Sequence, residues 1–449
     1  MKRKMNFSGR GGVFMFMAPV FLTLMMVICA GGPVYSAETQ KAVVATVAPD
    51  YSSGAHSVVS VDPVGGPRSV QNDLDPTVSD ITVASYENSF YILERTGRNN
   101  VTKYNIDNPA NAIWQWSTEG DETNSNPHDL VFESEQKAYL LRYGSDTAWI
   151  VNPSATREAD FKIGELDLSA YQYEGNAPGM HSGVIVDGKL FITLQRFDST
   201  WTPQTAYVAV FDVTTDTEID TGKGSGDMLG IPLPVKNPGA IQYLADNNTV
   251  YVQGSGHFFG TLEYSSGIAA IDPATYEVST VLDDGDEESH PYGFVVGMAI
   301  LSPTKGYFVG YAGWGDNTLY TFDPSEASPS GSAVSGFEHI QLAGMESGVY
   351  FDMNGFLWVC NQTDARVDIL NTDTDEIDES ISTNLNPSKV VFCVEATPPT
   401  PPPPAGDDGG GCFIDTASDS GLPLLPGLAV LFLIGLLCLA GRVVRGTKE

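Results

Sequence analysis

Histidines and carboxylates recur in this chain a few residues after a proline, or in one case a glycine, where a short apolar run begins. The positions that share this setting are Asp80, His128, Asp129, His181, Tyr292, Glu346 and Lys389. Imidazoles and carboxylates together can bind a transition metal or act as general bases. No tight ligand spacing such as His-x-x-x-His occurs among them, so the spacing favours ordinary solvated polar residues over a metal site.

A second set of candidate residues consists of aromatic side chains in long or glycine-rich connections. These are Phe197 and Trp201 within 196–205, the group His257, Phe258, Phe259 and Tyr264 within 254–267, and Trp314 between two glycines. Aromatic side chains on loops suit flat apolar ligands, the faces of sugars or a protein partner. The alternative is that they only cover the structure beneath them.

Acidic runs at 283–288 and 373–379 could in principle bind Ca²⁺ through clustered oxygens. Neither run has the glycine and terminal glutamate spacing of an EF-hand loop, so solvated turn charges are the simpler interpretation. The chain also lacks a glycine-rich phosphate loop, a Gly-x-Ser-x-Gly elbow, a Cys-x-x-Cys pair and a haem attachment motif. No cofactor is therefore evident, and the sequence leaves only Ca²⁺ or a transition metal open as a cofactor.

The overall charge restricts the partners. The chain has 23 Lys+Arg against 56 Asp+Glu, for a formal net charge of -33. Nucleic acids and anionic membrane surfaces repel such a polyanion, which argues against both as partners. A cation or a neutral ligand such as a glycan is easier to accommodate.

The amino-terminal residues 1–37 have the pattern of an export signal. Lys2, Arg3 and Lys4 precede an apolar run from Val13 to Ala30, and small residues around Ser36 offer a cleavage point. A permanent membrane anchor is the alternative. The cleavage-like sequence and the compact basic start favour removal of this segment.

The carboxyl-terminal end divides into a Pro/Gly-rich linker at 397–421, an apolar stretch at 422–441 and a basic tail at 442–449. The apolar stretch is long enough for a transmembrane helix, and the positive charge after it predicts a cytoplasmic tail. This layout resembles bacterial carboxyl-terminal sorting signals. The resemblance implies membrane retention, a dedicated sorting protease and Cys412, within a Gly-Cys motif, as the point of processing or lipidation.

The body of the chain is built from seven repeats. A short β-like run ends in an apolar residue and then Asp or Asn, at Asp62, Asp107, Asn152, Asp212, Asp272, Asp323 and Asn371. In six repeats an earlier strand-like run contains an aromatic residue: Tyr91, Tyr139, Phe191, Tyr251, Tyr307 and Trp358. An Asp or Asn side chain can bind the backbone two residues on and so begin a tight hairpin.

These repeats predict an all-β fold, a seven-bladed β-propeller over 38–396. A four-stranded unit cannot bury both faces alone, whereas seven units packed around an axis can. Before Asp62 there is room for a strand at 42–47 but none for an innermost strand, and one more strand follows at 387–392. We therefore expect the carboxyl-terminal strand to complete the first blade. The starts of the innermost strands, with the histidines and carboxylates described above, would then surround the mouth of a central channel.

The last repeat, with Trp358-Val359-Cys360-Asn361 followed by 365–374, resembles the YVTN-repeat β-propellers, which include surface-layer-like and periplasmic proteins. Trp358, Cys360 and Asn371 depart conservatively from that pattern, and the other repeats match more loosely. The resemblance covers roughly residues 42–394 and implies the fold. It implies little about activity, because propellers carry many functions.

The sequence thus favours a non-catalytic, exported propeller, held at the cell envelope by its tail, that binds a protein or glycan through its aromatic loops. A metal-assisted, lactonase-like hydrolase is the alternative, with His128, His181, Glu346 and Asp80 at the channel mouth as ligands or bases. A passive surface-layer component is a third possibility. Cys360 and Cys393, the two cysteines of the body, are expected to be buried free thiols, because they belong to strands of neighbouring blades. A disulfide between them, which oxidising conditions would permit, is the alternative.

Overall fold

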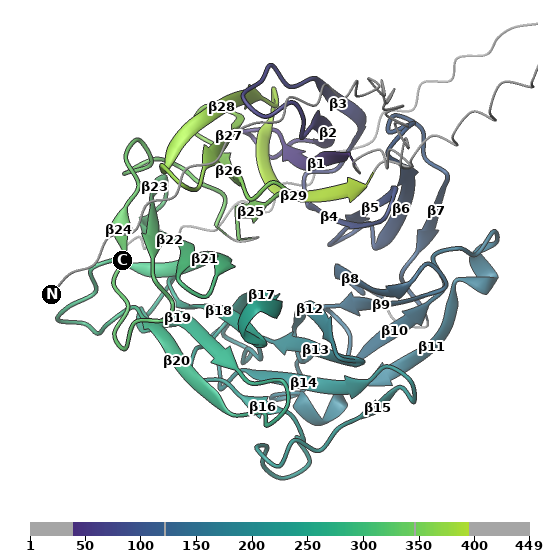
Figure 1. Cartoon of the computed structure of the whole chain (residues 1–449). Coiled ribbons are helices and arrows are strands. Elements are labelled where there is room, and N and C mark those ends of the chain that lie inside the picture. The colour runs from purple at the N-terminus through teal and green to yellow at the C-terminus, as the bar shows by residue number, and fades with distance from the viewer. Residues whose placement is uncertain (1–38, 121–122, 345–346, 395–449) are drawn as a thin grey trace, which may run out of the picture. The chain divides into compact units, whose positions relative to one another are not determined.

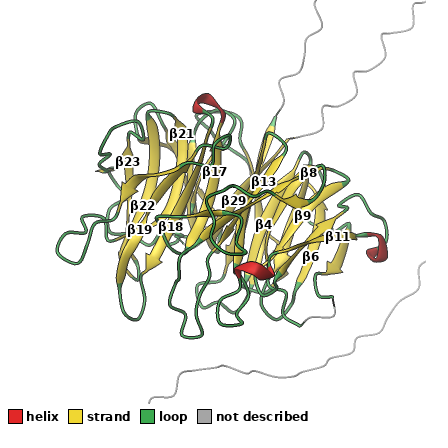
Figure 2. Cartoon of the chain, turned by 90° about the horizontal axis from the view of Figure 1, so that it is seen from below, coloured by secondary structure: helices red, strands yellow, loops and turns green. Residues whose placement is uncertain are grey.

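The short apolar runs of the sequence form twenty-nine strands in the computed structural model, which describes residues 39–120, 123–344 and 347–394. These strands make seven sheets around a central channel, so the predicted seven-bladed β-propeller is confirmed (Figure 1). Helical structure in the described residues is limited to three short 3₁₀ turns, η1 (Glu158–Asp160), η2 (Ser169–Tyr171) and η3 (Ala245–Asn247). The strands run between two faces made of loops (Figure 2).

The strands of each blade are named in order from the channel outward. Blade 1 contains β29 (Asn386–Val394), β1 (Gln40–Val47), β2 (Gly54–Ser60) and β3 (Val70–Thr77), and blade 2 contains β4 (Ile81–Tyr86), β5 (Ser89–Glu94), β6 (Asn100–Asn105) and β7 (Trp114–Ser117). Blade 3 contains β8 (Pro127–Ser134), β9 (Lys137–Arg142), β10 (Thr147–Val151) and β11 (Lys162–Asp167). Blade 4 contains β12 (Met180–Val186), β13 (Lys189–Leu194), β14 (Tyr207–Asp212) and β15 (Thr217–Glu218), with β16 (Ile231–Pro232) also paired to β14.

The remaining three blades follow the same order. Blade 5 contains β17 (Pro238–Leu244), β18 (Thr249–His257), β19 (Glu263–Ile271) and β20 (Val278–Asp283). Blade 6 contains β21 (Phe294–Ser302), β22 (Lys305–Gly313), β23 (Asp316–Phe322) and β24 (Ser332–Ala333). Blade 7 contains β25 (Val349–Phe351), β26 (Leu357–Asn361), β27 (Arg366–Asn371) and β28 (Glu376–Ser382).

The Asp or Asn at the end of the third strand begins the hairpin as predicted in most blades. In blade 4, Asp212 Oδ1 accepts the backbone N–H groups of Thr214 at 2.8 Å and Thr215 at 2.9 Å. In blade 2 the prediction is two residues out of register, because Asn105 rather than Asp107 provides the accepting oxygen, 2.8 Å from the Asp107 nitrogen. The strand simply ends earlier than the apolar Ile106 indicated.

The core of the molecule lies between the blades. Seven clusters of buried apolar side chains occur, and each is shared by two adjacent blades. The repeated aromatic residues of the second strands belong to these clusters; Tyr139, Tyr307 and Trp358, for example, have no exposed surface. The free energy of burial therefore stabilises blade-to-blade packing.

Polar contacts also join neighbouring blades. Lys305 Nζ of blade 6 lies 2.8 Å from an Asp375 carboxylate oxygen in blade 7, and the Tyr307 hydroxyl donates to the same carboxylate. Lys137 and Tyr139 of blade 3 bind Asp216 of blade 4 in the same way. The interpretation of the 373–379 run as solvated turn charges is therefore wrong for Asp375.

The ring is closed as predicted, by pairing of the two ends of the propeller. β1 and β29 are antiparallel neighbours, with Ala42 opposite Phe392 and Val44 opposite Val390. The innermost strand of blade 1 thus comes from the carboxyl-terminal end of the described chain, and its three outer strands come from the amino-terminal end (Figure 1).

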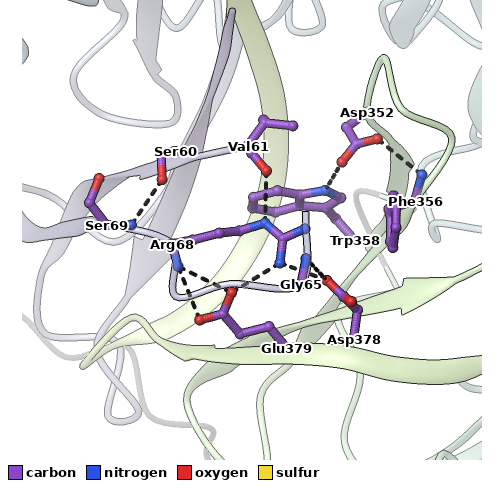
Figure 3. Close-up of polar contacts among 10 residues, drawn as sticks. All are labelled: Ser60, Val61, Gly65, Arg68, Ser69, Asp352, Phe356, Trp358, Asp378 and Glu379. Atoms are coloured by element: carbon purple, nitrogen blue, oxygen red, sulfur yellow. Dashed lines mark hydrogen bonds and ion pairs between the residues drawn. The ribbon is translucent and has the colours of Figure 1, made fainter. Parts of the chain in front are cut away.

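A second contact between blades 1 and 7 reinforces this closure. Arg68, in the connection between β2 and β3, has a fully buried guanidinium group whose Nη1 lies 2.9 Å from Asp378 and 3.0 Å from Glu379 of β28. Its Nε donates to the Val61 carbonyl at 2.8 Å. Figure 3 shows the guanidinium enclosed by these groups, beside Trp358. Asp378 and Glu379 are further residues of the acidic run that are not simply solvated, and we call this contact the Arg68 latch.

The predicted export signal at 1–37, the linker at 397–421 with Cys412, the transmembrane helix at 422–441 and the tail at 442–449 lie outside the described residues. Glu346 lies outside them as well. In the part of the chain that is described, no helix is long and apolar enough to cross a membrane.

Candidate functional site

The loops that join the second strand of each blade to the third share one face of the propeller. Blade 4 has the longest of them, between Leu194 and Tyr207, and blades 5 and 6 carry aromatic residues at the same place. We call these connections the aromatic loop face. The seven aromatic or histidine residues selected from the sequence all lie on it or at its edges.

In blade 4 the loop is shaped by Asp198. One oxygen of its carboxylate accepts the backbone N–H groups of Thr200 at 2.8 Å and Thr202 at 3.0 Å. The hydrogen bonds from Thr200 and Thr202 lower the pKa of Asp198, which keeps it ionised at neutral pH. The turn places Trp201 in a left-handed backbone conformation with its side chain 59% exposed, whereas Phe197 is buried beside it.

In blade 5 most of the aromatic residues support the structure. Tyr264 stacks on Phe294 with ring centroids 4.9 Å apart, and Phe258 contacts Phe294 and Tyr311. His257 is buried. Phe259, whose ring meets that of Phe258 edge to face, is the aromatic residue of this loop that is exposed.

In blade 6 the connection is a two-residue turn of Trp314 and Gly315. Gly315 has a φ of +75°, which glycine adopts without strain and which lets β22 and β23 form a tight hairpin. Trp314 is 76% exposed, the largest fraction of any large apolar side chain in the described residues. The turn therefore presents an indole ring to solvent on a rigid support.

Tyr51 of blade 1 belongs to the same set but was not selected from the sequence. It lies between β1 and β2, the second and third strands of its blade, and is 54% exposed. Because β1 is the second strand of its blade, the connection that contains Tyr51 is equivalent to the other aromatic loops. This equivalence could have identified Tyr51 from the sequence. In the described residues, the exposed aromatic side chains are Tyr51, Trp201, Phe259 and Trp314, and all four lie on the aromatic loop face.

The central channel is a cavity of about 610 Å³ lined by residues of all seven innermost strands. His128, Asp129, His181 and Lys389 line it near the starts of these strands, as the sequence predicted for three of the blades. Lys389 Nζ lies 3.9 Å from an Asp129 carboxylate oxygen, which joins blades 1 and 3 across the channel. Toward the other end of the same strands the lining is apolar and includes Phe132 and Phe392.

The two channel histidines lie close together. Their ring centroids are 5.0 Å apart, and the His128 ring stacks on Tyr143 at 4.4 Å. Burial lowers the pKa of His128 well below its usual value, and Arg95, His181 and Lys389 lower it further. His128 is therefore a neutral imidazole at physiological pH, the state that can accept a proton or bind a metal.

The other predicted channel residues have different roles. Asp80 forms an ion pair with Arg95 at 2.7 Å, and the Tyr292 hydroxyl accepts the backbone N–H of Gly331 at 2.8 Å. Neither is part of the channel lining. Over the described residues, no three His, Cys, Asp or Glu side chains are grouped so that they could hold a metal ion. The histidine pair could supply two ligands, and the described residues add no third.

Cys360 and Cys393 are buried free thiols, as expected. Burial raises the pKa of both thiols, so neither is a thiolate at neutral pH. Nucleophilic chemistry at these two residues is therefore not indicated.

No family model matches the sequence, and no curated protein matches it. Solved structures do share its fold. A "putative 6-phosphogluconolactonase" from Bacteroides fragilis is 10% identical, with a TM-score of 0.55 over 80% of this chain and 99% of that chain. Another from Bacteroides uniformis is 11% identical, with a TM-score of 0.55 over 79% and 99%. AztD from Citrobacter koseri is 13% identical, with a TM-score of 0.45 over 80% and 98%. The YVTN-repeat resemblance and the sorting tail stay predictions.

Proposed function

We propose that this chain is a non-catalytic binding module, exported and held at the cell envelope, that recognises a protein or glycan through the aromatic loop face. The observation that carries the proposal is the position of the exposed aromatic residues. Tyr51, Trp201, Phe259 and Trp314 come from four different blades, yet all lie on the equivalent loops of one face. Exposed aromatic rings on rigid supports provide large contact areas at small entropic cost.

The surroundings of these rings fit the same proposal. Phe197 packs against Trp201 and Phe258 against Phe259, so inner aromatic rings support the exposed rings of blades 4 and 5. The excess of acidic residues makes a polyanionic ligand unfavourable and leaves neutral glycans and cationic or neutral protein surfaces. The location at the envelope rests on the sequence of residues 1–37 and 397–449.

The test compares wild type with a Trp201→Ala, Trp314→Ala double variant of the full-length protein. A matched control replaces Ile163 and Ile377, which are also exposed but lie on outermost strands, by alanine. Binding is measured on a glycan array and by co-sedimentation with envelopes of the source cells before and after protease treatment. The array and the protease arm distinguish a glycan from a protein ligand.

The double variant should bind at least tenfold more weakly, because each buried aromatic contact contributes about 1–2 kcal/mol to such interfaces. The control variant should bind like wild type. Equal binding by the double variant and the control would reject the aromatic loop face as the binding site.

A hydrolase using His128 and His181 is the second candidate, because these rings adjoin a cavity large enough for a substrate. Elemental analysis of the purified protein tests it directly. One metal ion per chain that disappears in a His128→Ala, His181→Ala double variant would favour the hydrolase.

A further inference from the structure

A second cavity, of about 240 Å³, lies between blades 1 and 2. None of its lining residues belongs to the channel lining or carries one of the exposed aromatic rings. Its polar lining consists of His56, Asp75, Thr77, Glu94, Thr102, Tyr104 and Gln115. The cavity therefore requires an explanation of its own.

Two carboxylates define the chemistry of this cavity. Glu94 is buried, with 6% of its surface exposed, and Asp75 is exposed at the rim. Within residues 39–120, 123–344 and 347–394, neither forms an ion pair with a basic side chain. Burial of a carboxylate that lacks a cationic partner is unfavourable, so a bound cation would stabilise this site.

Three donors in the lining already bind its two carboxylates. The Thr77 hydroxyl donates to Glu94, the Gln115 amide nitrogen donates to Glu94 at 3.1 Å, and the Tyr104 hydroxyl donates to Asp75 at 2.6 Å. An ionised carboxylate offers about four acceptor positions. The unused capacity of the cavity is thus on the acceptor side, which fits a ligand with several N–H donors.

Aromatic rings form another part of the lining. The rings of His56 and Tyr104 have centroids 5.0 Å apart, and Phe90 stacks behind Tyr104 at 4.9 Å. Aromatic faces attract organic cations. With a volume of about 240 Å³, the cavity has room for a small molecule rather than a single ion.

We propose that this cavity binds a small organic cation with an ammonium or guanidinium group, with Glu94 as the main counter-ion and Asp75 at the entrance. The site is independent of the aromatic loop face and of the function proposed for it. A bare metal ion is less suitable, because the cavity is much larger than one ion and part of its lining is aromatic.

Calorimetric titration of the full-length protein with putrescine and agmatine tests the proposal, and 1,4-butanediol serves as the uncharged analogue of putrescine. We expect wild type to bind one amine per chain and not the diol. Glu94→Gln keeps the shape and the Gln115 and Thr77 neighbours, and it should weaken amine binding at least tenfold. Asp75→Asn should weaken it severalfold.

Asp187→Asn is the matched control, since Asp187 is an exposed aspartate with a left-handed backbone like Asp75 but lies outside the cavity. This control and the Trp201→Ala, Trp314→Ala variant should bind the amine like wild type. Absence of amine binding to wild type would overturn the proposal, as would wild-type affinity in a folded Glu94→Gln variant. Should Glu94→Gln fail to fold, unchanged affinity in Asp75→Asn or equal binding of the diol would overturn it. Stoichiometric Ca²⁺ binding that excludes the amine would also overturn it.

Discussion

At the scale of single residues, the buried carboxylate of Asp284 connects the acidic run 283–288 to the core. It has no exposed surface, and one of its oxygens accepts the Ser266 backbone N–H at 3.0 Å and the Ser266 hydroxyl at 2.5 Å. The same hydroxyl accepts the Val295 N–H at 2.8 Å, so Asp284 is linked through Ser266 to the first strand of blade 6. Burial raises the pKa of Asp284 to about 6.

This raised pKa predicts a pH dependence of stability. The folded protein holds the Asp284 proton more tightly than the unfolded chain, so the stabilisation is complete below about pH 4 and is lost as the pH rises through 6. Asp284→Asn cannot titrate. The free energy of unfolding of this variant, measured with urea from pH 4 to 7, should therefore increase relative to that of wild type as the pH rises, by up to about 3 kcal/mol.

Comparing the two proteins at each pH is necessary because other groups act in the opposite direction. Burial lowers the pKa of His56 and of His128, which removes stability as the pH falls below about 6.5. These histidines are present in both proteins and cancel in the difference. Asp187→Asn, which replaces an exposed aspartate in another blade, serves as the control, and parallel stability profiles for Asp284→Asn and wild type would contradict the assignment.

At the scale of elements, the Arg68 latch fastens the connection between β2 and β3 to the outermost strand of blade 7. Besides its two ion pairs, the backbone N–H of Arg68 donates to Glu379 at 3.2 Å, and that of Gly65 donates to Asp378 at 3.2 Å. The guanidinium is fully buried, whereas the carboxylates keep a minor part of their surface exposed. The latch therefore joins the outer part of blade 1 to the outer part of blade 7, whereas the β1–β29 pairing closes the ring within blade 1, near the axis.

Replacing Arg68 by methionine keeps most of the buried stem but removes both ion pairs. We expect the free energy of unfolding to fall by about 2 kcal/mol, less than for a fully buried pair because Asp378 and Glu379 can rehydrate. Arg157→Met is the control, since its pair with Asp160 is largely exposed and should contribute less than about 0.5 kcal/mol. An equal decrease in the free energy of unfolding in the two variants, measured with urea, would show that the latch stabilises the fold no more than an exposed ion pair does.

The Arg68 latch could not be predicted from the sequence, unlike the hairpins and the closing strand. The hairpins were predictable because Asp212 and its equivalents act within three residues, and the closing strand was predictable because one repeat lacked an innermost strand. Arg68 binds residues about 310 positions away in the sequence, so no periodic signal indicated these contacts. The cavity at Glu94 likewise depends on how two blades face each other.

The candidate site was partly predictable for the same reason. Repeat positions placed Trp201, Phe259 and Trp314 on equivalent loops, and these three are exposed. The sequence could not separate them from Phe197, Phe258 and Tyr264, because which ring packs inward depends on neighbours such as Phe294 in the next blade. Asp80 and Tyr292 were predicted at the channel mouth, and in the structure each binds a local partner, Arg95 and the Gly331 backbone respectively.

At the scale of the whole molecule, the seven interfaces depend on closure, since an open ring would expose the apolar faces of two blades. A chain ending after Leu385 lacks β29 and should lose cooperative thermal unfolding, whereas a chain ending at residue 396 should retain it. Circular dichroism melting curves and size-exclusion chromatography measure the two outcomes. Retention of a sharp transition without β29 would show that the six other blades are stable without the closing strand.

The pairing of β29 with β1 also sets an order on biosynthesis. A ribosome releases the amino-terminal strand of blade 1 first and its innermost strand last, more than three hundred residues later. During that interval β1 has an unpaired edge, which is the kind of surface that chaperones bind and that recruits stray strands. The nascent chain therefore needs protection until its final strand emerges.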